Sequence, residues 1–126
     1  SAKFFDIEYQ VYGDIPTNIP GNITSLYWQH PSENKSIRIN FEKSSGAVTG
    51  FNLLGIRYRQ VVCEKWIRDK THIETVIENL SLANFDPEFF DQYEGAFLEM
   101  YNQKSGKSLN LKSKRKLSMV TKFLFG

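Results

Sequence analysis

Apolar and polar side chains alternate strictly along residues 37–42, in the stretch around which we expect the rest of the chain to be organised. This period-two pattern is typical of a half-buried β-strand. Residues 43–46 (KSSG) then predict a four-residue hairpin loop, because the glycine at its end tolerates positive φ. Residues 47–54 return as a second strand, in which Gly50 indicates a bulge or a close backbone approach. A helix is expected from about Tyr58 to Asp69, lying back on the sheet.

Two more strands are predicted before this hairpin. Phe4–Tyr12 alternates well and ends at Gly13. Its apolar side consists of Phe5, Ile7, Tyr9 and Val11, and its polar side of Asp6, Glu8 and Gln10. Residues 14–21 contain two prolines and predict a loop. Ile23–His30 then forms the next strand, which the dipeptide His30-Pro31 closes.

Two helices are predicted directly after the hairpin. The first has an apolar stripe made of Tyr58, Val61, Val62 and Trp66, with Cys63 and Ile67 beside it. Thr71 and Glu74 fit a capping box at the start of the second, in which the threonine caps the helix and the glutamate bonds back to it. The second helix has the cleanest helical stripe of the chain, spaced i, i+3, i+4, i+7: Ile73, Val76, Ile77 and Leu80.

A third helix is expected to begin at Asp86-Pro87, because aspartate is a good N-cap and proline suits the first helical position. Phe85 and Phe90 stand where a hydrophobic staple would form. The apolar face of this helix comprises Phe89, Phe90, Tyr93, Phe97 and Met100. Its carboxylates are expected on the solvent face: Glu88, Asp91, Glu94 and Glu99.

These elements predict an α+β fold, with an antiparallel β-sheet of about four to five strands and two or three helices packed on one side. The chain of 126 residues is long enough for one domain with a substantial core. Charge divides it: residues 1–103 carry a net charge of −5, and residues 104–126 carry +7 with no acid. We therefore expect an α+β domain over 1–103 and a basic C-terminal tail over 104–126.

The composition of the chain indicates the cellular compartment in which the protein is expected. No apolar run approaches the length of a membrane span, and no signal peptide is visible. The single Cys63 excludes an internal disulfide and suits a reducing cytoplasm. The chain begins Ser1-Ala2-Lys3 without a methionine, so we expect it to be a piece of a longer protein. Ten Phe, six Tyr and two Trp indicate a core rich in rings or an apolar surface that faces a partner.

No catalytic residues are assigned from the sequence. His30 and His72 have no cluster of carboxylates or cysteines at metal-ligand spacing, so no metal site is predicted. Cys63 lies beside core positions and is expected to pack as a small apolar residue. Residues 50–55 hold too few glycines for a dinucleotide-binding loop.

Two segments carry a resemblance to a known family. Residues 1–13 (SAKFFDIEYQVYG) resemble W-S-D-Q-Y-D-x-K-L-Q-x-A-G, the strand that opens the C-terminal domain of FAD-dependent pyridine nucleotide-disulfide oxidoreductases in the ferredoxin and rubredoxin reductase branch. Asp6, Gln10 and Gly13 coincide with that pattern, and Phe5 stands for its tyrosine. The second segment is a hairpin that carries G-x-N-x-x-G into a helix, here residues 50–55 (GFNLLG).

The resemblance implies a non-catalytic domain that shapes the active-site wall beside upstream FAD and NAD(P) domains and often forms a homodimer interface. In this family the start of the first strand approaches the flavin. The cofactor-side residues would therefore be Ala2, Lys3 and Phe4, which differ from the family's Ser, Asp and Gln. His30-Pro31 echoes the acid-base motif of the disulfide reductases, but it precedes the hairpin, so that role is not carried over. Alone, the chain is expected to show no redox activity and to bind no flavin.

Two surfaces are predicted to meet partners. Self-association is expected through either the sheet face or the third helix, with Phe89, Phe90 and Phe97. An alternative function is a stand-alone binding module whose basic patch, Lys112, Lys114, Arg115 and Lys116, contacts an anionic membrane or nucleic acid. Leu117, Val120 and Leu124 follow at helical spacing and would give that segment an apolar strip. Nucleic acid is the less favoured partner, because residues 1–103 are net acidic.

Overall fold

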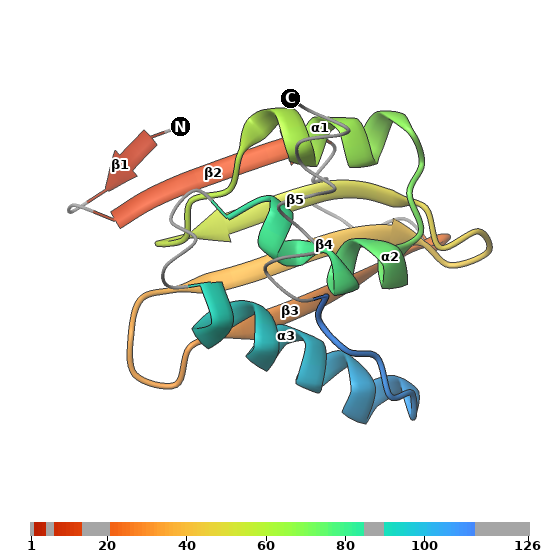
Figure 1. Ribbon diagram of the computed structural model, residues 1–126. Helices are drawn as coiled ribbons and strands as arrows, with labels where there is room; N and C mark the ends of the chain where they lie inside the picture. Colours follow the sequence, from red (N-terminus) through yellow and green to blue (C-terminus); the bar gives the residue numbers. More distant parts are fainter. Residues whose placement is uncertain (1, 5–6, 14–20, 85–89, 113–126) are drawn as a thin grey trace.

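A computed structural model describes residues 2–4, 7–13, 21–84 and 90–112. These residues form one antiparallel sheet of five strands: β1 (Ala2–Phe4), β2 (Ile7–Gly13), β3 (Ile23–Gln29), β4 (Ser36–Glu42) and β5 (Val48–Leu54). The strand order is β1-β2-β5-β4-β3 (Figure 1). The antiparallel sheet predicted from the sequence is therefore confirmed.

The β4–β5 hairpin forms as its sequence predicts. Gly46 closes the loop with a φ of +77°, and the N–H of Gly46 donates to the carbonyl of Glu42 at 2.8 Å. The register shifts by one residue at Thr49, which is the extra residue of a β-bulge. Gly50 beside it pairs with Gly13 of β2, where a Cβ on Gly13 would lie 2.4 Å from the Thr49 carbonyl oxygen. The predicted bulge and close approach at Gly50 are both present.

The first predicted strand differs from the expectation in two ways. Its residues belong to two paired strands, β1 and β2, rather than to one. The side chain of Gln10 is buried at 7% exposure on the helix side of β2, while Tyr9 and Val11 are exposed on the opposite side. Tyr9 and Val11 of the predicted apolar side therefore face away from the core, and on the core side the amide of Gln10 accepts a hydrogen bond from the backbone N–H of Tyr58 at 2.9 Å.

Four helical segments follow the sheet: α1 (Gln60–Arg68), α2 (Ile73–Glu78), the 3₁₀ turn η1 (Leu80–Leu82) and α3 (Phe90–Ser105). Figure 1 shows that they gather on one face of the sheet, as predicted, with α1 over β2 and β5 and α3 over β3. The first helix begins at Gln60 rather than at Tyr58, which pairs with Asn84 in an isolated bridge. Its apolar stripe also excludes Val61, which is 62% exposed.

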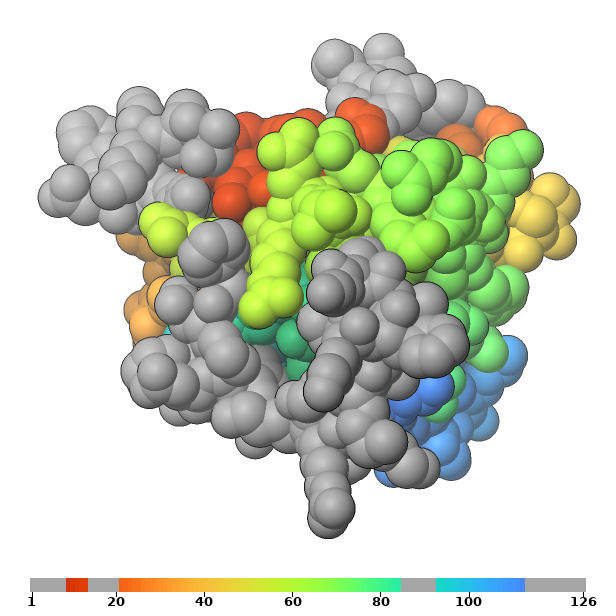
Figure 2. Space-filling model, turned by 45° about the horizontal axis from the view of Figure 1, so that its top comes forward, coloured from red at the N-terminus to blue at the C-terminus, as the bar shows by residue number. Residues whose placement is uncertain are grey.

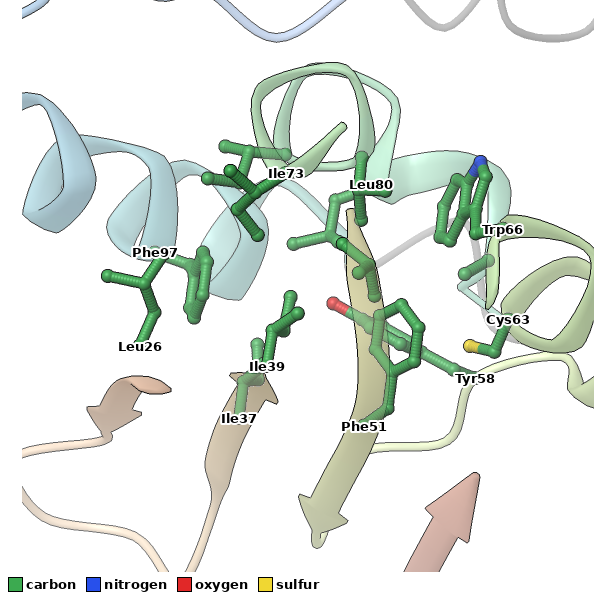
Figure 3. Packing of buried hydrophobic residues seen from close by; sticks show 14 of the residues in the cluster. Leu26, Ile37, Ile39, Phe51, Tyr58, Cys63, Trp66, Ile73, Leu80 and Phe97 are labelled. Carbon is green, nitrogen blue, oxygen red and sulfur yellow. The ribbon is translucent and has the colours of Figure 1, made fainter. Parts of the chain in front are cut away.

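The core lies between the sheet and these helices (Figure 3). Phe51 of β5 stacks on Trp66 of α1 with ring centroids 6.0 Å apart. The predicted burial of Ile73, Val76, Ile77 and Leu80 is confirmed, since each is at most 1% exposed, but α2 ends at Glu78 and Leu80 belongs to η1. Burying each of these aliphatic side chains stabilises the fold by about 1.5–3 kcal/mol.

The start of α2 is capped by a different residue from the one predicted. His72 is the N-cap, and its Nδ1 accepts a hydrogen bond from the N–H of Glu74 at 3.1 Å. The capping box at Thr71 is therefore wrong. The carboxylate of Glu74 instead accepts bonds from Lys107 Nζ and from the Tyr101 hydroxyl, the latter at 2.7 Å. Those bonds, that from Lys107 above all, lower the pKa of Glu74.

The segment after α3 returns to the domain. Asn102 exchanges two hydrogen bonds with the backbone of Leu109, at 2.9 and 3.0 Å. The N–H of Lys112 donates to the carbonyl of Glu78 at 3.0 Å. Leu109 and Leu111 pack against the core. The first part of the basic segment is thus held against α2 and α3.

Candidate functional site

The face of the sheet opposite the helices is the candidate functional site. Its side chains come from alternate positions of four strands, which the antiparallel register aligns in rows across the sheet. We call this surface the outer face, and it comprises Tyr9, Val11, Ser25, Tyr27, Arg38, Asn40, Asn52 and Leu54.

The outer face carries most of the exposed large apolar side chains found in the described part of the chain. Tyr9 is 39% exposed, Val11 43% and Tyr27 38%, and the fourth such residue is Val61 on α1. Isolated exposed apolar residues are ordinary, but a concentration of them on one face is typical of an interaction surface. The sequence had indicated the sheet face as one of two surfaces for self-association.

Arg38 lies at the centre of the outer face. Its guanidinium stacks over the Tyr27 ring at 4.5 Å from the centroid, and its Nη1 donates to Ser25 Oγ at 2.8 Å. The side chain is half-buried, and none of the described acidic residues forms an ion pair with it. Most of its five N–H donors therefore remain free to bind a carboxylate or another acceptor.

Asn40 adds a second polar group to this face. It is fully buried beside Gly50 and Ser25, and neither its amide nitrogen nor its amide oxygen has a hydrogen-bond partner among the residues that the structure describes. A buried amide left in this state costs about 1–3 kcal/mol.

His30 lies at one end of the sheet in an aromatic cluster with Trp28 and Tyr93, all centroid separations being 5.9–6.0 Å. Its Nδ1 accepts hydrogen bonds from the backbone N–H groups of Ser32 and Glu33, at 3.1 and 3.0 Å. Its Nε2 faces the Glu33 carboxylate at 3.1 Å. Both ring nitrogens are thus occupied in holding the β3–β4 turn, so this imidazole is not poised as a general base.

A buried carboxylate occurs where the sequence predicted a solvent-facing one. Glu94 of α3 is 0% exposed, and its Oε1 accepts from the Tyr58 hydroxyl at 3.2 Å and from Asn84 Nδ2 at 2.7 Å. The expectation for Glu94 is therefore corrected, whereas Glu99 is exposed as predicted. The cause is that two other segments, at Tyr58 and at Asn84, each present a hydrogen-bond donor to this position.

The segment after β5 joins this cluster to the sheet. Figure 2 shows residues 55–60, in yellow-green, running from β2, in red, toward η1, in teal. The backbone N–H of Arg59 donates to the carbonyl of Ala83 at 2.6 Å, and the Tyr12 hydroxyl donates to the carbonyl of Tyr58 at 3.1 Å. Burial, with the neighbouring Glu94 charge, raises the pKa of Tyr58. Tyr58 is therefore a neutral hydrogen-bond donor at the centre of the cluster.

Cys63 packs in the core beside Tyr58 and Phe51, as Figure 3 shows. It is 0% exposed, and burial raises the pKa of its thiol. Thiolate formation is needed for nucleophilic or metal chemistry, so this cysteine is chemically inert in the folded protein. Its predicted packing role is confirmed.

The other predicted site residues are distributed widely. Ala2, Lys3 and Phe4 form the outermost strand, β1. Phe97 is 0% exposed in the core, so its ring offers no surface to a partner. The side chains of Phe89 and Phe90 lie outside the described residues. Lys112 is exposed, and Lys114, Arg115 and Lys116 lie outside the described residues.

Sequence reasoning missed the central role of Arg38 and the burial of Glu94. The position of Arg38 in an alternating strand placed it on a face, but only the pairing of β3 with β4 brings Tyr27 and Ser25 to it. Among the described residues, no group of His, Cys, Asp and Glu side chains could hold a metal ion. No described helix combines the length and the apolar character that crossing a membrane requires.

No protein-family model, no curated protein and no solved structure matches the chain.

Proposed function

We propose that this chain is the C-terminal interface domain of an FAD-dependent pyridine nucleotide-disulfide oxidoreductase, with the outer face of its sheet packed against another part of the enzyme. The observation that carries the proposal is the concentration of Tyr9, Val11 and Tyr27 around Arg38 on a face that none of the described helices covers. The enzyme class comes from the resemblance of residues 1–13 and 50–55, and this step from fold to function is an analogy.

In this function the domain forms part of the active-site wall and of an interface, and it contributes no catalytic residue. FAD and NAD(P) would be bound by upstream domains of the same protein, and Ala2, Lys3 and Phe4 would lie nearest the flavin. Docking would remove Val11 and the two tyrosines from water, which stabilises the association by roughly 25 cal/mol for each Å² of apolar surface buried. Arg38 would meet an acidic or carbonyl group of the neighbouring domain.

The test uses the intact natural protein, sequenced from its initiator methionine and purified with its flavin. Val11→Asp should place a charge in the docked interface and lower NAD(P)H oxidation and flavin retention by roughly tenfold or more, since an unpaired buried charge costs several kcal/mol. Val61→Asp is the matched control, because Val61 is more exposed and lies on α1. Intact protein that contains no flavin domain, or equal effects of the two substitutions, would refute the proposal.

A second candidate function is supported by the +7 charge of residues 104–126. We propose as the alternative a weak, peripheral contact of this basic tail with anionic membrane on the cytoplasmic side, each basic residue contributing about 1 kcal/mol near the surface. Co-sedimentation with anionic and neutral liposomes tests it, comparing the full chain with one that ends at Lys112. Ending there keeps the contacts of Leu109 and Leu111 with the core. Equal sedimentation of both forms with anionic vesicles would exclude the membrane role.

A further inference from the structure

The two edge strands of the sheet, β1 and β3, differ in the features that prevent pairing with strands of other chains. β1 has only three residues and includes Lys3, and short edge strands with a lysine discourage pairing with other chains. β3 has seven residues, ITSLYWQ, with no charge, proline or glycine. In the described part of the chain β3 pairs with β4 alone. β3 is therefore a long, uncharged edge that is suited to pair with another strand.

Hydrogen bonds at both ends of the β3–β4 ladder fix which backbone groups point outward. The N–H of His30 donates to the carbonyl of Lys35 at 2.8 Å, and that of Lys43 donates to the carbonyl of Asn22 at 2.9 Å. Residues 22 and 30 thus bond toward β4, and antiparallel ladders alternate, so every even-numbered residue between them does the same. The outward N–H and C=O groups belong to Ile23, Ser25, Tyr27 and Gln29.

We propose that β3 pairs with β3 of a second copy of this chain, antiparallel and around a two-fold axis at Leu26. This register sets Ile23 opposite the partner's Gln29 and Ser25 opposite the partner's Tyr27, and it uses all four outward residues in about eight backbone hydrogen bonds. A shift of two residues in either direction leaves one end residue of each strand without a partner. One register of β3 against itself therefore forms more hydrogen bonds than the others, which favours β3 of a second copy as the strand that pairs with this edge.

Charges beside the two ends of β3 complement each other in this arrangement. Pairing around Leu26 brings Asn22 of one copy next to the partner's His30. Lys43 adjoins Asn22 through its backbone bond, and Glu33 is held at the His30 ring at 3.1 Å. The dimer thus brings exposed Lys43 of each copy toward the partner's Glu33, twice by symmetry. The uncharged strand between them contributes no like-charge repulsion.

The paired strands would join the two sheets into one. Tyr27, now 38% exposed, would pack beside the partner's Ser25 on the outer face. The two outer faces would then form one continuous surface. Docking of that surface against another domain does not require the β3 edges to pair. The dimer does not depend on the enzyme class proposed above.

Sedimentation equilibrium over a range of concentrations, with amide hydrogen exchange by NMR, tests the pairing in the full chain. We expect a reversible monomer–dimer equilibrium in which the amides of Ile23, Ser25, Tyr27 and Gln29 become protected as the dimer forms. The even-numbered amides of β3 should be protected in both states. A strict monomer at every concentration, or a dimer in which those four amides exchange as in the monomer, would overturn the proposal.

Tyr27→Pro and Tyr27→Thr form a matched pair of variants. Both remove the ring, but only proline removes an outward N–H, and proline is tolerated on an edge strand whose N–H faces solvent. Dimer affinity should be roughly tenfold or more lower for Tyr27→Pro, because two hydrogen bonds per dimer are lost. Circular dichroism should show both variants folded. Equal affinities of the two folded variants would contradict the pairing.

A charge exchange tests the register independently. Glu33→Lys and Lys43→Glu should each weaken the dimer, and the double variant should restore it. Failure of the double variant to recover affinity would overturn the two-fold axis at Leu26. Val11→Asp should leave dimerisation unchanged, so failure of the outer-face function and failure of the β3 pairing are distinguishable.

Discussion

Removal of the Tyr58 hydroxyl should destabilise the fold more than its size suggests. The hydroxyl donates to Glu94 Oε1 at 3.2 Å in a site where both side chains are at most 1% exposed. Tyr58→Phe keeps the buried ring and withdraws one donor from a buried carboxylate. A hydrogen bond to a charged group contributes about 1.5–3 kcal/mol, so we expect a loss of that size in the free energy of unfolding. For a domain of this length, the melting temperature should fall by roughly 6–11 °C.

Urea denaturation followed by circular dichroism measures this loss, with Tyr27→Phe as the control. The Tyr27 hydroxyl also donates to a side chain, Gln29 Oε1 at 3.1 Å, but on the exposed side of the sheet. Its removal should change stability by no more than about 0.5 kcal/mol. Equal losses in the two variants would refute the reasoning that burial and charge determine the effect.

A second comparison isolates the charge of Glu94. In a Glu94→Gln background the acceptor remains but is neutral, and a neutral hydrogen bond contributes only about 0.5–1.5 kcal/mol. Tyr58→Phe should therefore cost less in that background than in the natural chain. Additive effects in this double-mutant cycle would show that the charge of Glu94 does not strengthen the bond from the Tyr58 hydroxyl.

Three other predictions follow from single sites. Gly46→Ala should destabilise the fold more than Gly106→Ala. Both glycines have positive φ, +77° and +74°, but only at Gly46 would an added Cβ lie 2.3 Å from the His72 imidazole. Equal shifts in the denaturation curves of the two variants would contradict this clash. The bond from Lys107 lowers the pKa of Glu74 in the folded protein. The stability that this carboxylate contributes is therefore complete above pH 4.5 and is lost as the pH falls through the lower pKa of the folded state. In a pH series, the natural chain should lose its stability advantage over Glu74→Gln as the pH falls through this range. The buried Cys63 thiol should react with a disulfide reagent only after unfolding, and rapid labelling of native protein would disprove its burial.

Local sequence signals predicted those elements whose partners are close in the chain. The β4–β5 hairpin needed only alternation and Gly46, and α2 needed only the spacing of Ile73, Val76 and Ile77. The orientation of β2 could not be predicted in this way. Its apolar side should have faced the core by pattern alone, but the bond between Gln10 and the backbone of Tyr58, 48 residues away, decides the face.

The candidate site depended on such distant pairings even more. Arg38 was visible as a polar residue in a strand, but its stacking on Tyr27 requires the register of β3 against β4. Glu94 looked like a solvent-facing carboxylate because its helix carries several. The donors that hold it come from two other segments, at Tyr58 and Asn84, which the sequence of α3 does not reveal.

The position of β2 in the sheet also separates folding into a fast part and a slow part. β3, β4 and β5 join neighbours along the chain through short turns, so the loops that close them are small. β2 pairs with β5 across 37 residues (Gly13 with Gly50) to 45 residues (Tyr9 with Leu54), so this ladder can form only after the β3–β4–β5 meander is complete. Because non-local pairings form late, the N-terminal hairpin is the segment that should dock last and detach first. During synthesis, β2 would thus have no partner in the main sheet until β5 has emerged.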